Sequence, residues 1–221
     1  MKSIAVLNQK GGSGKTHLSV MLALSLSNKD RVCVVDCDPQ GGLTSFCNVS
    51  GPGMFELLTM QKFEPLQITW GKFNFDVIPA DHRLDNIYAT LQPFAIEKAF
   101  KDFDYDYLIF DCPPTVQGIT RATALFADKI IIPADISRAT IGPTLYTLDA
   151  LKDIKKTGKV YLLGKDPGEK TGFTADLTRE MMKALKNHLG GFITKSVSIQ
   201  KAVSGETMPG DKTLEIYRGM I

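Results

Sequence analysis

Residues 9–16 read QKGGSGKT and stand between a short apolar run, Ile4–Asn8, and a helix-like stretch, Thr16–Asn28. A glycine-rich turn between a strand and a helix can wrap its backbone N–H groups around phosphate oxygens, and the start of the helix adds the positive end of its dipole. A turn without any ligand is the alternative, but the strand–loop–helix order favours phosphate binding. The stretch therefore predicts a nucleotide site at the start of an α/β fold.

Two lysines distinguish this loop from an ordinary glycine-rich turn. Lys15 stands where a phosphate-binding loop reaches the β- and γ-phosphates, and the Thr16 hydroxyl is placed to ligate Mg²⁺. The usual spacing, G-x-x-x-x-G-K-[ST], puts glycine at position 9, where this chain has Gln9. The chain has instead a second lysine, Lys10, directly before two glycines. A solvated surface lysine is the alternative for Lys10, but its place in the loop favours a role in the site.

Carboxylates follow two other apolar runs. Tyr107–Asp111 ends in an aspartate, the form of a strand whose carboxylate holds Mg²⁺, usually through water. A second run ends in Asp36, with Asp38 two positions later, so that on a strand the two would share a face. Ligands of open α/β sheets bind at the carboxyl ends of the strands, which is where these groups are expected. A turn formed by Asp38 and the proline after it, without chemistry, is the alternative.

Short apolar runs alternate with longer helix-like stretches, which is the pattern of a parallel sheet covered by helices on both faces. The predicted strands are Ile4–Asn8, Arg31–Asp36, Phe75–Pro79, Tyr107–Asp111, Lys129–Pro133 and Val160–Leu163. The predicted helices are Thr16–Asn28, Asp81–Leu91, Ile96–Phe103, Gly118–Phe126, Ile141–Lys156 and Ala175–Leu189. We predict one domain over residues 1–221, with the three-layer α/β fold of P-loop NTPases: a mostly parallel sheet flanked by helices.

The composition is ordinary for a globular protein, with 43% hydrophobic and 23% charged residues. It excludes a mostly disordered chain. No apolar run reaches the roughly 18 residues of a membrane span, and the first residues lack the pattern of a secretory signal, so we expect a cytoplasmic protein. The four cysteines form no C-x-x-C motif, and the three histidines are scattered, which predicts reduced structural thiols in place of a disulfide or a zinc site.

Three motifs in this order resemble the ParA/Soj branch of the deviant Walker A ATPases, within the ParA/MinD superfamily. They are KGGSGKT at residues 10–16, DCDPQ at residues 36–40 and DCPP at residues 111–114. The pair Asn8-Gln9 and the run ADKIIIP at residues 127–133 resemble the same family. The likeness covers roughly the first 145 residues.

The resemblance implies a Mg²⁺-dependent ATP hydrolase that works as a homodimer. Two chains would sandwich two ATP molecules, and Lys10 of each would reach the phosphates bound by the other, like an arginine finger supplied in trans. Because ADP lacks the γ-phosphate that holds this lysine, ATP would favour the dimer and ADP the monomer. Asp38 would position or activate the attacking water, and the segment Pro113–Thr120 would read the γ-phosphate. The implied catalytic residues are Lys10, Lys15 and Asp38; the implied ATP-binding residues are Lys10, Gly11, Gly12, Ser13, Gly14, Lys15, Thr16 and His17; the implied metal-binding residues are Thr16, Asp111 through water, and Asp36 in a supporting position.

The chain departs from the family pattern in two places. His17 stands where the family usually has Thr or Ser, which predicts altered contacts to the α-phosphate. The segment Ile193–Ala202 resembles a stretch that normally reads isoleucine-proline-arginine-asparagine, but Thr194 and Ser196 are not the family residues. Adenine contacts from this segment are therefore left open.

The resemblance also implies a biological role, because ParA-type proteins segregate plasmids or chromosomes. Their ATP-bound dimer binds double-stranded DNA without sequence preference, and a centromere-binding, ParB-like partner stimulates hydrolysis. Residues 151–221 hold 13 Lys and Arg against 8 Asp and Glu, an excess that suits phosphate contacts or simply a solvated surface. The first predicted strand begins with the chain, as in the short ParA type without a helix-turn-helix extension, and we expect a nucleoid-associated protein. The DNA-binding candidates are Arg179, Lys183, Lys186, Lys195 and Lys201, of which the first three are spaced to share one helix face.

Three alternatives share the same loop. A MinD-like positioning ATPase binds membranes through a basic amphipathic C-terminal helix, but residues 213–221 carry one Arg against one Glu, so no membrane partner is expected. An ATPase like the nitrogenase iron protein needs two cluster-binding cysteines per chain, and no cysteine here resembles those ligands. An enzyme of the dethiobiotin synthetase kind needs a polar substrate pocket, for which the sequence shows no constellation.

Overall fold

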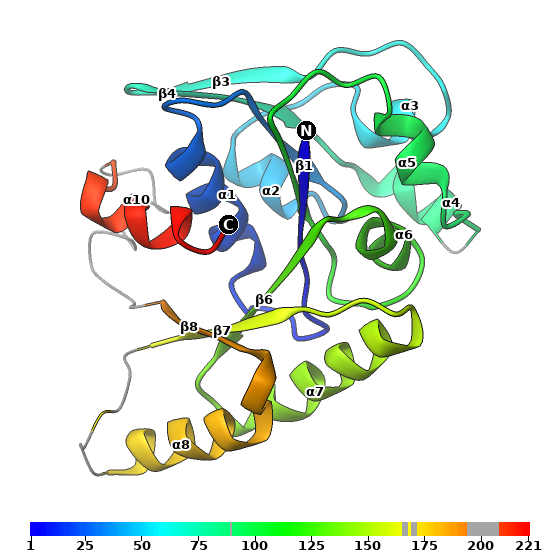
Figure 1. Ribbon diagram of the computed structural model, residues 1–221. Coiled ribbons are helices and arrows are strands. Elements are labelled where there is room, and N and C mark those ends of the chain that lie inside the picture. Colours follow the sequence, from blue (N-terminus) through cyan, green and yellow to red (C-terminus); the bar gives the residue numbers. More distant parts are fainter. Residues whose placement is uncertain (89, 165–167, 169–171, 194–207) are drawn as a thin grey trace.

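The computed structural model describes residues 1–88, 90–164, 168, 172–193 and 208–221 (Figure 1). Within this part of the chain, eight strands form one sheet in the order β3-β4-β2-β5-β1-β6-β7-β8. Neighbouring strands are parallel except β3 and β4, which are antiparallel. The strands are β1 (Lys2–Val6), β2 (Val32–Asp36), β3 (Leu66–Trp70), β4 (Phe73–Ile78), β5 (Tyr107–Asp111), β6 (Lys129–Asp135), β7 (Lys159–Leu163) and β8 (Leu189–Ile193).

Helices cover both faces of this sheet (Figure 1). The sheet and the two helical layers confirm the predicted mostly parallel, three-layer α/β fold. The α-helices are α1 (Lys15–Leu26), α2 (Gly42–Phe46), α3 (Met54–Leu58), α4 (Asp85–Tyr88), α5 (Ala95–Phe100), α6 (Ile119–Phe126), α7 (Arg138–Asp153), α8 (Phe173–Leu185) and α10 (Asp211–Arg218). Two 3-10 turns, His82–Leu84 and Lys186–His188, precede α4 and follow α8.

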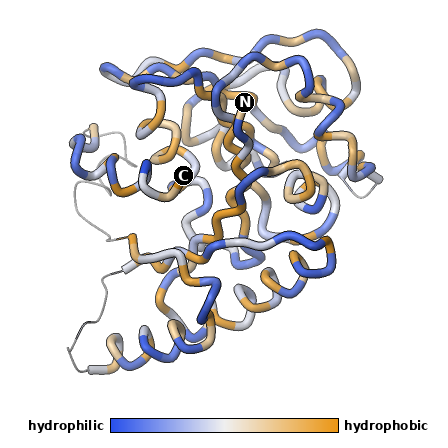
Figure 2. Tube along the Cα trace, viewed as in Figure 1, coloured by the Kyte–Doolittle hydropathy of each residue, from blue (hydrophilic) through white to orange (hydrophobic). Residues whose placement is uncertain are grey.

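The central strands are apolar on both sides because each side faces its own core. In β1 and the residue after it, Ile4 and Val6 belong to the core under α1 and α10, whereas Ala5 and Leu7 belong to the core under α5, α6 and α7. Figure 2 shows this concentration of apolar residues along the middle of the sheet. A continuous apolar run is the pattern expected of a strand buried on both faces, and it explains why these strands were predictable.

The predicted strands all occur, but the sequence did not reveal β3 and β8. β3 lies at the sheet edge and is only partly buried, so it lacks a continuous apolar run. β8 contains two glycines, which weaken a strand pattern. Gly190 has a packing reason, because a Cβ at that position would lie 2.7 Å from the Tyr161 ring.

Two predicted helices were wrong in extent. The stretch Asp81–Leu91 forms a 3-10 turn and the four-residue α4 in place of one helix. The stretch Ala175–Leu189 ends its α-helix at Leu185, because Lys186 adopts a positive φ of 40° and the chain then enters β8. Short α2 and α3, of five residues each, offer too few residues for helical periodicity to be recognised.

Candidate nucleotide-binding site

The glycine-rich loop leaves β1 and enters α1, as predicted. Gly12 and Gly14 have φ angles of 70° and 88°, in the left-handed region that favours glycine. Gly14 is the N-cap of α1, so the loop leads directly into the positive end of the helix dipole. A Cβ on Gly11 or Gly12 would meet nothing within 4 Å, so the space beside these two glycines is open.

The loop borders a cavity of about 320 Å³, a volume that suits the phosphate end of a nucleotide. The hydroxyl of Ser13 is buried and has no hydrogen-bond partner among the described residues. An open glycine cradle and an unsatisfied hydroxyl at a helix N-terminus fit a phosphate chain. The residues lining the cavity are Gly11, Gly12, Ser13, Gly14, Lys15, Thr16, His17, Asp38, Cys112 and Pro114.

The two lysines of the loop lie in different environments. Lys15 is buried, and its Nζ donates to the carbonyl oxygen of Lys10 at 3.3 Å. Burial lowers the pKa of Lys15, although the carboxylate of Asp111 acts in the opposite direction. The Nζ of Lys10 instead donates to the Gly11 carbonyl at 3.1 Å in an exposed position. Lys15 is therefore held inside the site, whereas Lys10 has an exposed amine and is not among the residues that line the cavity.

Thr16 and Asp111 meet at the base of the cavity. The Thr16 hydroxyl donates to Oδ2 of Asp111 at 2.6 Å, and the Ser19 hydroxyl, one helical turn later, donates to Oδ1 at 3.3 Å. A hydroxyl and a carboxylate are hard oxygen ligands, which fit Mg²⁺ completed by substrate phosphates and water. Asp111 is buried and does not line the cavity, and its contact with Mg²⁺ through water stays a prediction.

The predicted pairing of Asp36 and Asp38 on one strand face was wrong, because β2 ends at Asp36. Asp38 lies in the following turn, where its Oδ1 accepts from the backbone N–H of Gln40 at 2.9 Å, and it lines the cavity. Asp36 is fully buried, and its Oδ2 accepts from the backbone N–H and the hydroxyl of Thr44 at 2.8 and 2.7 Å. Asp36 thus supports the turn that carries Asp38. No sequence pattern pointed to Thr44, because α2 is too short to show one.

Burial raises the pKa of both carboxylates, Asp36 and Asp111. Burial, together with the charge of Asp36, raises the pKa of Asp111 from its ordinary value of 3.8 to about 7. Burial also raises the pKa of Asp36, to about 6. Desolvation is the larger cause for both groups, and hydrogen bonds from Thr16 and Thr44 oppose it. Without a cation, ionising the site is therefore costly, which favours the arrival of a positive charge.

The stability of the chain without Mg²⁺ and nucleotide is expected to fall as pH rises from 5 to 8. Because the pKa of this carboxyl is higher in the folded state, the folded chain still holds a proton above about pH 4, where the unfolded chain has released it. The free energy of unfolding therefore decreases as pH rises through the folded pKa. For Asp111 the loss is about 2–3 kcal/mol over this range. Urea unfolding at several pH values measures it, and Asp111→Asn should reduce the slope. An unchanged slope in this variant would contradict the prediction.

Asn8 connects the start of the loop to β6 and α7. It is fully buried, and its Nδ2 donates to the Pro133 carbonyl at 2.9 Å and to the Thr144 hydroxyl at 3.2 Å. Its Oδ1 accepts from the backbone N–H of Lys10 at 3.1 Å. The backbone N–H of the next residue, Gln9, donates to the Thr147 hydroxyl at 3.1 Å. The strand–loop boundary thus fixes the backbone from which the Lys10 side chain extends.

Asn8→Ala is expected to destabilise the chain by about 1–3 kcal/mol, because it leaves the Lys10 N–H and the Pro133 carbonyl without their buried partner. ATP turnover should fall more than ATP affinity, because the Lys10 backbone is no longer fixed, whereas Lys15 is also positioned by its burial and by its place in α1. Urea unfolding and phosphate release measure the two effects. The exposed Asn28→Ala is the matched control, and equal effects from the two variants would refute the role of Asn8.

His17 borders the cavity and also contacts the C-terminal helix. Its Nε2 lies 3.4 Å from the hydroxyl of Tyr217 in α10, and the two rings meet edge to face. Tyr217 is fully buried against α1. This contact joins residues 200 positions apart, and no local sequence pattern pointed to it. The predicted effect of His17 on the α-phosphate stays a prediction.

The proposed DNA-contacting residues are only partly described. Lys183 is exposed on α8, and Arg179 on the same helix forms an ion pair of 2.7 Å with Asp176. Lys186 does not continue this helix face, since α8 ends at the preceding residue. Lys195 and Lys201 lie outside the described residues, as does the segment from Thr194 onward that was considered for adenine contacts.

All four cysteines are free and buried, as the sequence predicted. Among the described residues, no group of three or more His, Cys, Asp or Glu side chains is arranged to hold a metal ion by itself. Within the same part of the chain, no helix combines the length and the apolar character needed to cross a membrane.

Comparison with known proteins identifies the family. A family model described as an AAA domain matches residues 1–163, which is well over half of the 221 residues. The chain therefore belongs to this AAA-domain family. Its relatives specify the branch, and they confirm the resemblance to ParA/Soj-type partition ATPases.

Two curated relatives and one solved structure represent these similarities. "Maintenance of carboxysome distribution protein A" of Gloeothece citriformis is 30% identical over 172 residues, covering 72% of this chain and 66% of the relative. "Chromosome-partitioning ATPase Soj" of Thermus thermophilus is 31% identical over 162 residues, covering 70% of this chain and 63% of the relative. Apo McdA of Cyanothece is 23% identical with a TM-score of 0.82, covering 100% of this chain and 98% of that one, and it confirms the fold. The chain thus spans about two thirds of the length of the curated relatives.

Proposed function

We propose that this chain is the ATPase of a DNA segregation system, for a plasmid or a chromosome. The observation that carries the proposal is the pair of lysines on one loop: Lys15 lines the cavity, whereas Lys10 has an exposed amine and is not among the lining residues. An ordinary phosphate-binding loop needs only the inner lysine. A second one with an exposed amine suits phosphates bound by a second copy of the chain.

Hydrolysis follows from the placement of the charged groups. The loop N–H groups and Lys15 hold the β- and γ-phosphates, and Asp38, which borders the same cavity, orients the attacking water. Lys15 and the partner copy's lysine stabilise the charge that develops on the γ-phosphoryl group. When bound, Mg²⁺ neutralises phosphate charge, and Thr16 with Asp111 through water would hold it there.

The γ-phosphate controls association in this proposal. ATP presents more negative charge to the incoming Lys10 than ADP does, so the sandwich dimer forms with ATP and separates after hydrolysis. Pro114 borders the cavity, so the segment from Pro113 to Thr120 starts where a γ-phosphate would be sensed.

The DNA part of the proposal is supported by the name of the Soj relative and by exposed basic residues. Lys183 on α8, doubled by dimer symmetry, offers phosphate contacts that need no base recognition. A ParB-like protein at the centromere would stimulate hydrolysis, and the chain would be found in the cytoplasm on the nucleoid. The carboxysome relative supports a second candidate in which the same cycle positions a protein-bound cargo.

The membrane-bound, MinD-like alternative receives less support from α10. Leu214 and Tyr217, on the apolar side of this helix, are buried in the core that α1 forms with the sheet. A membrane-binding helix needs its apolar face for lipid, and here that face is already occupied.

Binding to a random-sequence DNA duplex tests the DNA proposal. We expect binding with a non-hydrolysable ATP analogue and not with ADP, with an affinity that falls steeply between about 50 and 200 mM salt. Lys183→Glu should weaken it, and Lys29→Glu, an exposed lysine on another part of the surface, serves as the matched control. Hydrolysis of ATP without DNA binding in any nucleotide state would contradict the proposal and favour another cargo.

A further inference from the structure

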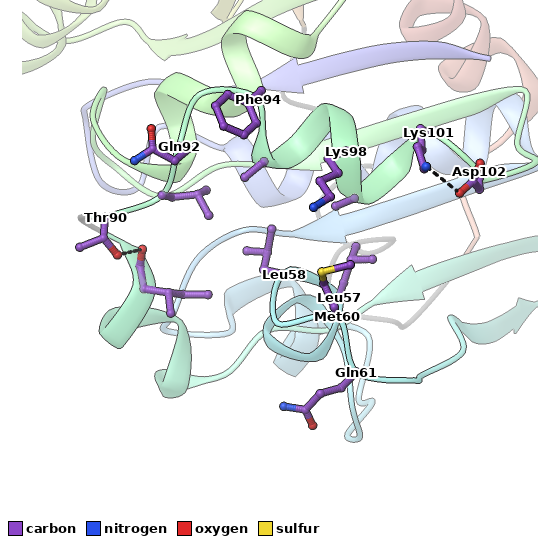
Figure 3. Close-up of a pocket in the computed structure, with 14 residues that line it drawn as sticks. Leu57, Leu58, Met60, Gln61, Thr90, Gln92, Phe94, Lys98, Lys101 and Asp102 are labelled. Atoms are coloured by element: carbon purple, nitrogen blue, oxygen red, sulfur yellow. Dashed lines mark hydrogen bonds and ion pairs between the residues drawn. The ribbon is translucent and has the colours of Figure 1, made fainter.

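An apolar groove of about 650 Å³ lies apart from the nucleotide site, between α3 and α5 (Figure 3). One wall consists of Leu57, Leu58 and Met60, from α3 and the residues after it. The other wall includes Leu91 and Phe94, from the connection between α4 and α5. The volume is twice that of the cavity beside the glycine-rich loop, and apolar side chains dominate the lining.

Two of these side chains are unusually exposed for their type. Met60 is 78% exposed and Phe94 62% exposed, although both border the groove. A single exposed apolar residue needs no explanation, but two that border one apolar groove indicate a surface that another molecule covers.

The charges along α5 indicate what that molecule carries. Lys98 and Lys101 border the groove three positions apart on this part of the chain, and Figure 3 shows both with their side chains at the α5 wall. Lys101 lies 3.7 Å from Asp102, whereas Lys98 has no ion pair with any residue that the structure describes. The groove edge therefore has a net positive charge that is complementary to acidic side chains.

The walls also indicate the shape of the occupant. Among the described residues the walls are helices and the turns between them, with no strand edge, so an added strand would find no backbone partners there. An amphipathic helix fits such a groove, with apolar residues at positions i, i+3 or i+4, and i+7. We propose that this groove binds an amphipathic helix of a partner protein, apolar on one side and acidic along its flank.

Helix α4 lies between the groove and the segment of residues 113–120, which follows Asp111. Ile87 borders the groove, and its neighbour Tyr88 packs on Gly118, where an added Cβ would lie 2.5 Å from the Tyr88 carbonyl oxygen. A helix bound in the groove would press on α4 and through it on this segment. The docking surface itself goes beyond the proposed function, because binding there requires neither nucleotide nor DNA.

Peptide selection tests the proposal. Helical peptides of about 15 residues are selected from a displayed random library for binding to the full chain without nucleotide. We expect recovered peptides with an apolar stripe and flanking Asp or Glu. Measured by fluorescence anisotropy, their affinity should fall at least tenfold when Met60→Ala and Phe94→Ala are combined. It should fall several-fold with Lys98→Glu, and Phe173→Ala, an exposed phenylalanine outside the groove, should leave it unchanged.

Four results would overturn the proposal: no recovered binder, recovered peptides with basic flanks, binding that is insensitive to the groove variants, or self-association of the chain that Phe94→Ala abolishes. The last would show a second copy as the occupant. Because Met60 and Phe94 are exposed, the alanine variants are expected to keep the thermal stability of the wild type, which calorimetry checks. Peptide binding is measured without ATP, so it stands or fails separately from the DNA proposal.

Discussion

Lys15→Ala is expected to weaken ATP binding by about 100-fold or more and to leave no measurable hydrolysis. Lys15 is the cation buried inside the cavity, where water does not screen its charge. Removing one preorganised charge-stabilising group from such a site costs about 10²–10³ in rate, before the loss of ground-state binding is added. Titration with a fluorescent ATP analogue and phosphate release measure the two losses.

The same substitution should leave folding intact. Burial lowers the pKa of Lys15, which means that the folded chain keeps this cation at a cost and does not depend on it for stability. We therefore expect unfolding in urea to be unchanged or shifted to slightly higher denaturant. Lys29→Ala, which removes an exposed lysine, is the control for charge. ATP affinity within threefold of the wild type would show that the cavity is not the phosphate site.

Lys10→Ala is expected to lower the rate of hydrolysis by about 10³-fold, the range of a finger residue supplied in trans. Its Nζ donates to the neighbouring Gly11 carbonyl in an exposed position, and its charge also acts on Asp135, so we expect it to contribute little to ATP binding within one chain. Its contribution arises when a second chain brings it to the γ-phosphate. Affinity for a single ATP should therefore change far less than the rate.

This contrast separates the two lysines experimentally. The Lys15→Ala substitution already lowers the affinity for ATP. The Lys10→Ala substitution instead lowers the turnover rate and changes how that rate depends on protein concentration. Mixing Lys10→Ala with Lys15→Ala chains should restore part of the turnover. In the mixed dimer, the nucleotide site of the Lys10→Ala chain keeps its own Lys15 and receives Lys10 from the Lys15→Ala chain. The other site lacks both lysines and should stay inactive. Hydrolysis by Lys10→Ala at the wild-type rate would show that the second lysine has no part in the reaction.

The nucleotide loop was predictable because its chemistry is local. Residues 9–16 determine a turn, a helix start and a lysine position by themselves, and β1 and β5 are apolar on both faces. The register of these two strands brings Asp111 to the level of Val6, directly below the loop. For that reason the meeting of Thr16 and Asp111, 95 positions apart, followed from a parallel sheet.

The supporting contacts were not predictable because they join distant elements that lack a pattern of their own. Thr44 belongs to a five-residue helix, and Tyr217 reaches His17 across 200 positions. The groove beside α5 likewise depends on how α3 and α4 sit on the sheet, which no periodicity encodes. Ser19 is the exception, since its place one turn after Thr16 on a predicted helix could have indicated a contact with the same carboxylate.

We expect the γ-phosphate to join two chains through Lys10. Analytical sedimentation is the most direct test of this claim, with Mg²⁺ and either a non-hydrolysable ATP analogue or ADP added to the wild-type chain. We predict a dimer with the analogue, a monomer with ADP, and a monomer with both nucleotides for Lys10→Ala. The same mass with the analogue and with ADP, or a dimer that persists in Lys10→Ala, would contradict this claim.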